Sequence, residues 1–324
     1  METAFAAPAF YLSLYRFTLL LHDRLILPSH KGSTLRGGFG NAFKAIICPH
    51  PQRCRPRCRQ GNNCPFGYVF QTAPPSEARV LRALDQVPRP FVIEPPWDQR
   101  TVYEPDETLT FQLILVGEAC RYLTYFILAF QELGERGLGG QESRFKLASV
   151  EALQPLAGET ALLFDAAQPA QICRDALPIR WDDIETYAAR LPAHRLTLNF
   201  LTTTRLLEDR APAAAPRFQL LVDYLLTRVS SLSAFFCGAL LEVDFPGLKE
   251  RAAGVELTRN ESAWQDWSRH SRHQQQDIKM GGFVGRATYA GALAEFLPLL
   301  ALGELIHVGK GVVFGNGMYR LTAF

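Results

Sequence analysis

The sequence lacks any long hydrophobic run. Hydrophobic residues make up 48% of the 324 positions. No segment, however, approaches the roughly 18 consecutive apolar residues that a membrane-spanning helix needs. The chain also starts Met1-Glu2, without the basic beginning of a secretory signal peptide. These absences argue against a membrane protein or a membrane partner and predict a cytoplasmic location, where disulfides are rare.

Acidic residues are missing between Asp23 and Glu77, although the whole chain is nearly neutral with a net charge of +2. A local excess of positive charge favours a polyanionic partner such as nucleic acid, and the alternative is a solvated basic loop. The basic residues of this stretch are Arg24, Lys31, Arg36, Lys44, Arg53, Arg55, Arg57 and Arg59.

The familiar phosphate-binding and RNA-binding motifs are also missing. No Gly-Lys pair is followed by Ser or Thr as in a P-loop, and no G-x-G-x-x-G opens a helix. The RNP1 signature of an ordinary RNA-recognition motif is absent as well. A glycine-rich stretch is nevertheless present in GELIHVGKGVVFGNGMYRL (303–321), where Gly309, Gly311, Gly315 and Gly317 stand between two strand-like runs. Such glycines predict close approach of a backbone or a ligand, or else a bulge or tight turn without a ligand.

The hydrophobic pattern predicts an α+β fold of two tandem ferredoxin-like (βαββαβ) units. In the first half we expect strands at 9–27, 91–96, 107–117 and 143–150, and helices at 34–47 and 118–135. In the second half we expect strands at 194–206, 254–259, 278–291 and in the stretch from 303, and helices at 217–238 and 292–304. The corresponding domains are 1–150, with a Cys/Arg-rich insertion at 48–75, and 194–324, with a connector at 151–193.

Two of these helices have clear apolar faces. The first is expected to begin at an N-cap formed by Ser33 and Thr34. Its apolar side would hold Leu35, Phe39, Phe43, Ile46 and Ile47. The helix at 217–238 has its apolar residues at helical spacing, namely Phe218, Leu221, Val222, Leu225, Val229 and Leu232.

Four stretches carry a family resemblance and stand in order along nearly the whole chain. They are KGSTLRGGFGNAFKAIIC (31–48) with CPFGYVF (64–70), RGLGGQESRFKL (136–147), WSRHSRHQQQDIKMGGFVGRATYAG (267–291) and LPLLALGELIHVGKGVVFGNGMYRL (297–321). With tandem ferredoxin-like units, they resemble the RAMP superfamily of CRISPR-associated proteins. Within it, the chain is similar to the endoribonuclease that cuts the CRISPR repeat transcript into guide RNAs for antiviral defence.

The resemblance implies metal-independent cleavage by the RNA's own 2′-hydroxyl, giving a 2′,3′-cyclic phosphate and a 5′-hydroxyl, with no cofactor for catalysis. Such a reaction needs a base, an acid and positive charge at the phosphorus. We expect His30 to act as base or acid, because relatives place a catalytic histidine close to the first helix. Lys31, Arg36 or Lys44 would stabilise charge. The alternative for His30 is an exposed loop histidine without a role.

RNA contacts are also implied by the resemblance. Backbone N–H groups at the glycine loops would approach RNA phosphates. The residues expected to contact RNA are Arg36, Gly137, Gly139, Arg269, Arg272, Gly309, Lys310, Gly311, Gly315 and Gly317. Among the other histidines, His307 is expected to be a core or hydrogen-bonded strand residue. His270 and His273 are expected on a solvated polar face, with a second catalytic or RNA-contacting cluster as the alternative.

Four cysteines of the insertion, Cys48, Cys54, Cys58 and Cys64, are spaced C-x5-C-x3-C-x5-C. Zinc prefers tetrahedral thiolate sites, and a loop without a hydrophobic core needs a staple. This spacing favours a structural zinc, with His50 as a substitute ligand. An iron–sulfur cluster, disulfides or free thiols are the alternatives.

Three functions therefore remain open from the sequence. The leading one is the repeat-RNA endoribonuclease, with CRISPR repeat or guide RNA as its partner and other CRISPR effector subunits as further partners. The second is a non-catalytic RAMP subunit that scaffolds guide RNA, since the same glycine loops would serve it. The third is a zinc-dependent adaptor without an RNA role.

Overall fold

The computed structural model describes residues 5–51, 58, 60–72, 87–168, 177–271 and 276–322. It divides the chain into two compact units. The N-terminal unit comprises Phe10–Ile179 and Phe235–Gly238, and the C-terminal unit comprises Met1–Ala9, Arg180–Ala234 and Ala239–Phe324. None of the described helices is long and apolar enough to cross a membrane.

The N-terminal unit contains a βαββαβ core. Its elements are β1 (Tyr11–Leu21), α1 (Gly32–Ile47), β3 (Phe91–Glu94), β5 (Thr108–Val116), α3 (Leu123–Arg136) and β6 (Phe145–Gln154). The sheet order β3-β5-β1-β6 is that of a ferredoxin-like sheet, and β7 (Glu159–Asp165) adds a strand beside β6. The short β8 (Ile179–Arg180) pairs with β1. Smaller elements are β2 (Leu25–Ile26), η2 (Gly61–Asn63), α2 (Pro65–Phe70), β4 (Val102–Tyr103) and η4 (Gly117–Tyr122).

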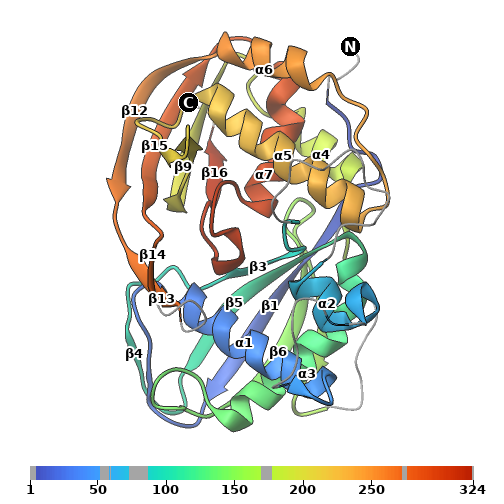
Figure 1. Ribbon diagram of the computed structural model, residues 1–324, viewed down its shortest axis with the longest axis vertical. Coiled ribbons are helices and arrows are strands. Elements are labelled where there is room, and N and C mark those ends of the chain that lie inside the picture. The colour runs from blue at the N-terminus through green and yellow to red at the C-terminus, as the bar shows by residue number, and fades with distance from the viewer. Residues whose placement is uncertain are drawn as a thin grey trace. The chain divides into compact units, whose positions relative to one another are not determined.

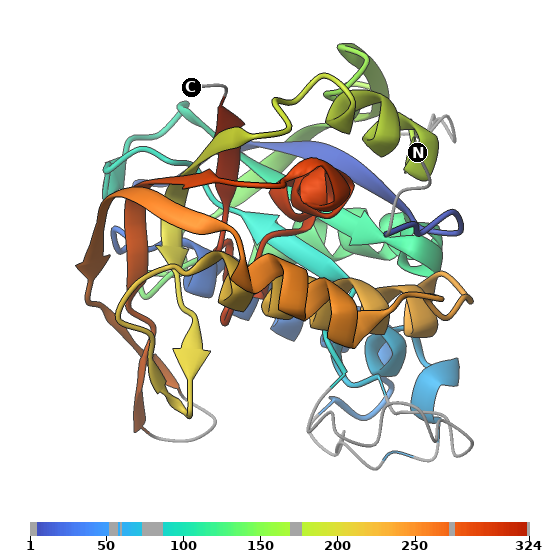
Figure 2. The same cartoon turned by 90° about the horizontal axis from the view of Figure 1, so that it is seen from above.

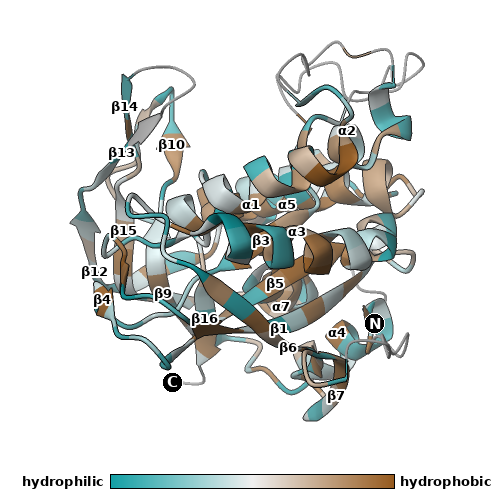
Figure 3. Cartoon of the chain, turned by 90° about the horizontal axis from the view of Figure 1, so that it is seen from below, coloured by the Kyte–Doolittle hydropathy of each residue, from teal (hydrophilic) through white to brown (hydrophobic). Residues whose placement is uncertain are grey.

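Phenylalanines hold the N-terminal unit together. Phe39 of α1 stacks on Phe126 and Phe130 of α3, with ring centroids 4.7 and 5.2 Å apart. Phe17 of β1 stacks on Phe111 of β5 at 5.2 Å. Figure 1 shows α1 and α3 against this sheet, and Figure 3 shows brown, hydrophobic stretches along β1 and β5. Burial of these rings stabilises the packing of α1 on the rest of the unit. The residues at the start of α1 are therefore held in a defined position.

The C-terminal unit repeats the same core order. Its elements are β9 (Arg195–Thr204), α5 (Phe218–Phe236), β12 (Glu256–Gln265), β15 (Gly282–Ala290), α7 (Leu297–Ile306) and β16 (Tyr319–Thr322). The sheet order β12-β15-β9-β16 is again ferredoxin-like. Figure 2 looks along α7, with β16 beside it. Further elements are α4 (Trp181–Ala188), β10 (Leu207–Glu208), β11 (Ala211–Pro212), α6 (Phe245–Ala253), β13 (Ser268–Ser271), β14 (Gln276–Lys279), η5 (Ala294–Phe296) and η6 (Val312–Phe314).

The predicted fold class is confirmed, and several local predictions change. The six apolar residues expected on the 217–238 helix are all buried. In α1, Ile46 is 37% exposed and not part of the core. The helix begins at Gly32 with Lys31 as N-cap and no side-chain cap, so the cap expected from Ser33 and Thr34 is wrong.

The segment expected to be a connector, 151–193, holds more regular structure than its composition indicated. It contributes the last four residues of β6, the hairpin partner β7 and the helix α4. The domain boundaries expected at 150 and 193 therefore do not coincide with the division of the chain near residue 179. The reason is that β6 continues to Gln154 and pairs with β7.

Candidate functional site

His30 lies in the turn between β2 and α1, immediately before the helix. Its side chain is half-buried. Burial lowers the pKa of the imidazole below its usual value, and the nearby charge of Lys31 lowers this pKa further. A histidine with a lowered pKa is neutral at neutral pH and is able to accept a proton. These properties suit a general base.

Lys31 does not occupy the position expected of a group that contacts RNA. Its side chain is completely buried, and Nζ lies 2.9 Å from Oδ1 of Asp98 in an ion pair. The same Nζ donates a hydrogen bond to the backbone carbonyl of Asp98 at 2.8 Å. The expectation that Lys31 stabilises charge on the substrate is therefore corrected, because its ammonium faces protein partners and not solvent.

The other two predicted basic residues lie on α1 at different distances from His30. Arg36 is one turn into the helix, and its guanidinium carbon lies 5.2 Å from the ring centre of Phe70. Lys44 is in the last turn. At 1.5 Å per residue it stands roughly 18 Å along the axis from the helix start. Arg36 is thus the predicted charge nearer to His30, whereas Lys44 is remote from it.

The first glycine-rich turn follows α3. Gly137 has φ 87° and Gly139 has φ 81°, in the left-handed region that favours glycine. A side chain at Gly137 would overlap the backbone of Glu142, because Leu138 and Ser143 pair across the turn. At Gly137, close approach of protein backbone is therefore sufficient to require glycine.

The second glycine-rich stretch, residues 307–317, is held to the core of the C-terminal unit by several hydrogen bonds. The hydroxyl of Thr202 donates to the carbonyl of Gly315 at 2.8 Å, and Lys310 N–H donates to the carbonyl of Arg205 at 3.0 Å. Gly317 has φ 76°, and a side chain there would overlap the carbonyl of Val308. We call residues 307–317 the C-terminal glycine loop. It is a fixed turn packed on its own unit.

Basic and aromatic side chains surround the C-terminal glycine loop. Lys310 is exposed. The guanidinium carbon of Arg269 lies 4.6 Å from the ring centre of Phe314. Arg205 donates to the carbonyl of Gly281 at 3.1 Å. The structure thus places Arg269 beside the loop that carries Lys310, and it adds Arg205, which sequence reasoning missed. Arg272 lies outside the described residues.

His307 is not in a strand, which corrects the sequence expectation. It ends α7 with φ 65°, and its ring is completely buried. Its Nδ1 lies 3.0 Å from the backbone oxygen of Asn316, so the imidazole spans the two ends of the C-terminal glycine loop. The expected hydrogen-bonded core histidine is confirmed. His270 lies in β13, and His273 falls outside the described residues.

Three of the four cysteines predicted to bind zinc lie among the described residues. Cys48, Cys58 and Cys64 are free thiols, and Cys54 lies outside the described residues. Within the described part of the chain, no three His, Cys, Asp or Glu side chains gather closely enough to hold a metal ion. The described cysteines therefore do not form a zinc site among themselves.

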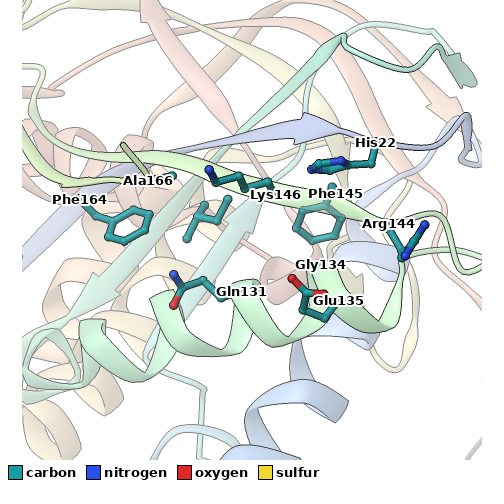
Figure 4. Close-up of a pocket in the computed structure, with 10 residues that line it drawn as sticks. His22, Gln131, Gly134, Glu135, Arg144, Phe145, Lys146, Phe164 and Ala166 are labelled. Carbon is teal, nitrogen blue, oxygen red and sulfur yellow. The ribbon is translucent and has the colours of Figure 1, made fainter. Parts of the chain in front are cut away.

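A pocket of about 470 Å³ lies in the N-terminal unit, and none of the predicted site residues lines it. Gln131 and Glu135 border it from α3, and His22 and Lys146 lie opposite them (Figure 4). Its basic lining residue Arg144 is paired with Asp23 at 3.4 Å. The pocket combines basic, acidic and amide groups, and no pattern among them selects one class of ligand.

Two family models match the chain, one in each half. Residues 10–175 match the AF_1859_N family model, described as an N-terminal domain. Residues 198–319 match the model described as CRISPR-associated endoribonuclease Cas6. The chain therefore matches the Cas6 family model over its C-terminal part. It belongs to the AF_1859_N family through its N-terminal half.

Similar proteins cover nearly the whole chain. An uncharacterized protein of Archaeoglobus fulgidus is 24% identical over 325 residues, covering 97% of this chain and 100% of the relative. A structure described as a Cas6 product complex has a TM-score of 0.57 at 16% identity, covering 96% of this chain and 100% of that one. Cas6 of Thermus thermophilus has a TM-score of 0.54 at 15% identity, covering 97% and 99% of the two chains. These structural matches support the tandem ferredoxin-like fold.

A larger assembly gives a further match. A structure described as a partial Cas6-RT-Cas1–Cas2 complex has a TM-score of 0.61 at 13% identity. The match covers 97% of this chain and 46% of that chain. The Cas6-like fold is therefore found both as a chain of this length and within a longer polypeptide.

Proposed function

We propose that this Cas6-like chain cuts CRISPR repeat RNA without a catalytic metal. The observation that carries the proposal is His30, a half-buried imidazole with a lowered pKa at the start of α1. His30 takes the proton of the RNA 2′-hydroxyl, and the 2′-oxygen then attacks the adjacent phosphorus. The P–O5′ bond breaks, and the leaving 5′-oxygen takes up a proton. The products are a 2′,3′-cyclic phosphate and a 5′-hydroxyl.

Positive charge in the same region supports this assignment. The start of α1 carries the positive end of the helix dipole, which stabilises an anion. Arg36 lies one turn further along the same helix. These groups would favour the extra negative charge of the transition state. Lys44, far from His30 on the helix, would instead contact the RNA outside the reaction centre.

RNA binding is assigned to the two glycine-rich turns and their basic neighbours. Lys310 on the C-terminal glycine loop is exposed, and Arg269 is oriented by Phe314. Both residues suit phosphate contacts. Gly137 and Gly139 shape the first turn, and backbone N–H groups there would serve the same purpose. Arg272 remains a predicted RNA contact from sequence.

Two further partners are proposed, another CRISPR protein and a zinc ion. Association with other CRISPR proteins follows from the match to a Cas6-RT-Cas1–Cas2 complex. A structural zinc is proposed from the four-cysteine spacing, three members of which are free thiols. This zinc would fold the insertion and take no part in cleavage. Metal analysis of the purified protein, with and without Cys58→Ser, tests it, and about one zinc per chain is expected in the wild type only.

The test of the proposed function is cleavage of a repeat RNA in excess EDTA by wild type and His30→Ala, with RNA affinity measured in parallel. We expect His30→Ala to bind normally and to cleave about 100- to 10,000-fold more slowly. His22→Ala is the matched control, because His22 is an exposed histidine of the same unit to which the mechanism gives no role. Equal cleavage by all three proteins would remove His30 from the mechanism. Tight binding without cleavage by wild type would support the guide-RNA scaffold instead.

A further inference from the structure

Lys31 and Asp98 form a buried connection beside His30 that the mechanism above does not use. The Lys31 side chain has no solvent exposure, and Asp98 supplies both a carboxylate oxygen at 2.9 Å and a backbone oxygen at 2.8 Å. Burying a lysine ammonium is costly unless its charge and its N–H groups are satisfied. Two acceptors from one residue give this lysine a defined position.

Asp98 is itself held in place. The hydroxyl of Tyr103 donates to its Oδ1 at 2.7 Å, and the N–H of Arg100 donates to the same oxygen at 3.2 Å. Tyr103 is buried in β4, and its ring is covered by the guanidinium of Arg100, whose carbon lies 4.6 Å from the ring centre. Pro95 and Pro96 precede Asp98 and restrict its loop.

The same loop also holds the chain on the other side of His30. Leu27 N–H donates to the carbonyl of Thr101 at 2.8 Å, and Leu25 pairs with Tyr103 between β2 and β4. The three residues 28–30 therefore span two anchors, Leu27 on Thr101 and Lys31 on Asp98. Because both anchors belong to residues 98–101, His30 is fixed relative to that loop at both ends.

We propose that the Lys31–Asp98 pair, supported by Tyr103, positions His30 for the cleavage reaction. The pair acts through His30 and does not contact the RNA. This inference rests on the proposed function of His30. Displacing a catalytic group by about 1 Å is enough to cost on the order of 100-fold in rate.

Single-turnover cleavage with saturating protein tests the proposal, with RNA affinity and melting temperature measured on the same samples. We expect Asp98→Asn and Lys31→Met to cleave about 10- to 100-fold more slowly while their RNA affinity changes less than about threefold. Tyr103→Phe removes only one hydroxyl and should slow cleavage less than the other two changes. Because this change is small, Tyr103→Phe still tests the proposal if Lys31→Met fails to fold.

The decisive comparison uses the His30→Ala background. If the pair acts through His30, adding Asp98→Asn to His30→Ala causes no further loss of cleavage rate. A purely structural role would slow the double variant further. Glu104→Gln is the matched control, because it breaks an exposed ion pair with Arg24 in the same β2–β4 region and should leave cleavage unchanged.

Two results would overturn the inference while leaving the proposed function intact. One is wild-type cleavage by Asp98→Asn and Tyr103→Phe although His30→Ala is inactive. The other is loss of RNA affinity in folded Lys31→Met, which would show that the pair shapes the RNA-binding surface and does not act through His30. Cleavage by His30→Ala at the wild-type rate would instead refute the role of His30, and the positioning role would fall with it.

Discussion

A glycine that RNA requires and a glycine that the fold requires look the same in a sequence. The structure distinguishes the two cases at Gly317, because a side chain at this position would overlap the carbonyl of Val308 in the same unit. Its positive φ of 76° adds a second reason for glycine. At this residue, folding alone explains the pattern. The case for RNA at the same loop therefore depends on Lys310 and Arg269 and not on the glycines.

The pH dependence of cleavage is a prediction about His30 alone. Burial and the charge of Lys31 lower the pKa of His30 below the usual value of a histidine, so the neutral imidazole predominates at neutral pH. Cleavage should therefore rise with pH to a plateau, with an acid midpoint below 6.5. Single-turnover rates across this range at saturating protein measure it. A midpoint above the ordinary histidine value would contradict the assignment.

The same pKa has a consequence for stability. The unfolded chain binds the His30 proton more tightly than the folded chain, because its pKa is lowered only in the folded state. Protonation of His30 therefore favours unfolding as the pH falls below the unfolded pKa, and His30→Gln should reduce this part of the acid sensitivity. Melting curves of the two proteins at mildly acidic and neutral pH provide the comparison.

Among the elements, helix α1 offers a matched pair of glycines. A side chain at Gly37 would meet no atom within 4 Å, whereas one at Gly38 would meet Leu133 at 3.0 Å and Leu138 at 3.1 Å. Alanine is the better helix former by about 0.5–1 kcal/mol. We expect Gly37→Ala to raise the free energy of unfolding by about that amount and Gly38→Ala to raise it less or to lower it. Urea denaturation of both variants measures the two free energies of unfolding. Equal stabilisation would show that Leu133 and Leu138 shift without cost to make room for the new methyl group.

The core elements were predictable where a strong periodic pattern coincided with tertiary packing. The apolar positions of α5, from Phe218 to Leu232, are spaced as a helix and are buried as a helix. The pattern failed at Ile46, which is apolar but lies on the exposed side of α1. The pattern also failed at His307, which was expected in a strand. His307 instead follows the last residue of the apolar helix α7 as its C-cap, with a φ of 65°.

The sequence suggested individual residues of the candidate site but not the contacts between them. The role of His30 was predicted from the family resemblance, which places a histidine close to the first helix, and it stays a prediction. Its neighbour Lys31 was assigned to the substrate. Its partner Asp98 lies 67 residues away along the chain. No local spacing links these two positions, because the contact arises when β4 pairs with β2. A charge that appears available in a sequence is therefore not necessarily available in the folded chain.

For the whole molecule, net charge gives no reason to bind RNA. The chain has 34 Lys and Arg against 32 Asp and Glu, and the net charge is +2. Long-range attraction of the entire protein is therefore weak, and affinity must come from a few local phosphate contacts. Many charges are also paired within the protein, as Lys249 is with Asp223 at 3.3 Å. Only cations left available to the backbone of RNA contribute to the salt dependence of binding.

This reasoning predicts how salt affects RNA affinity. Affinity falls as salt rises, and each phosphate contact of single-stranded RNA makes the slope of log affinity against log salt concentration steeper by roughly 0.7. Lys310→Ala should therefore weaken binding and reduce that slope by about this amount. Lys249→Ala is the control of the same residue type, because its ammonium already faces Asp223, and its slope should match the wild type. Affinities of the three proteins for one repeat RNA over a series of salt concentrations provide the measurement. An unchanged slope in Lys310→Ala would show that the C-terminal glycine loop, although rigid and basic, lies away from the RNA backbone.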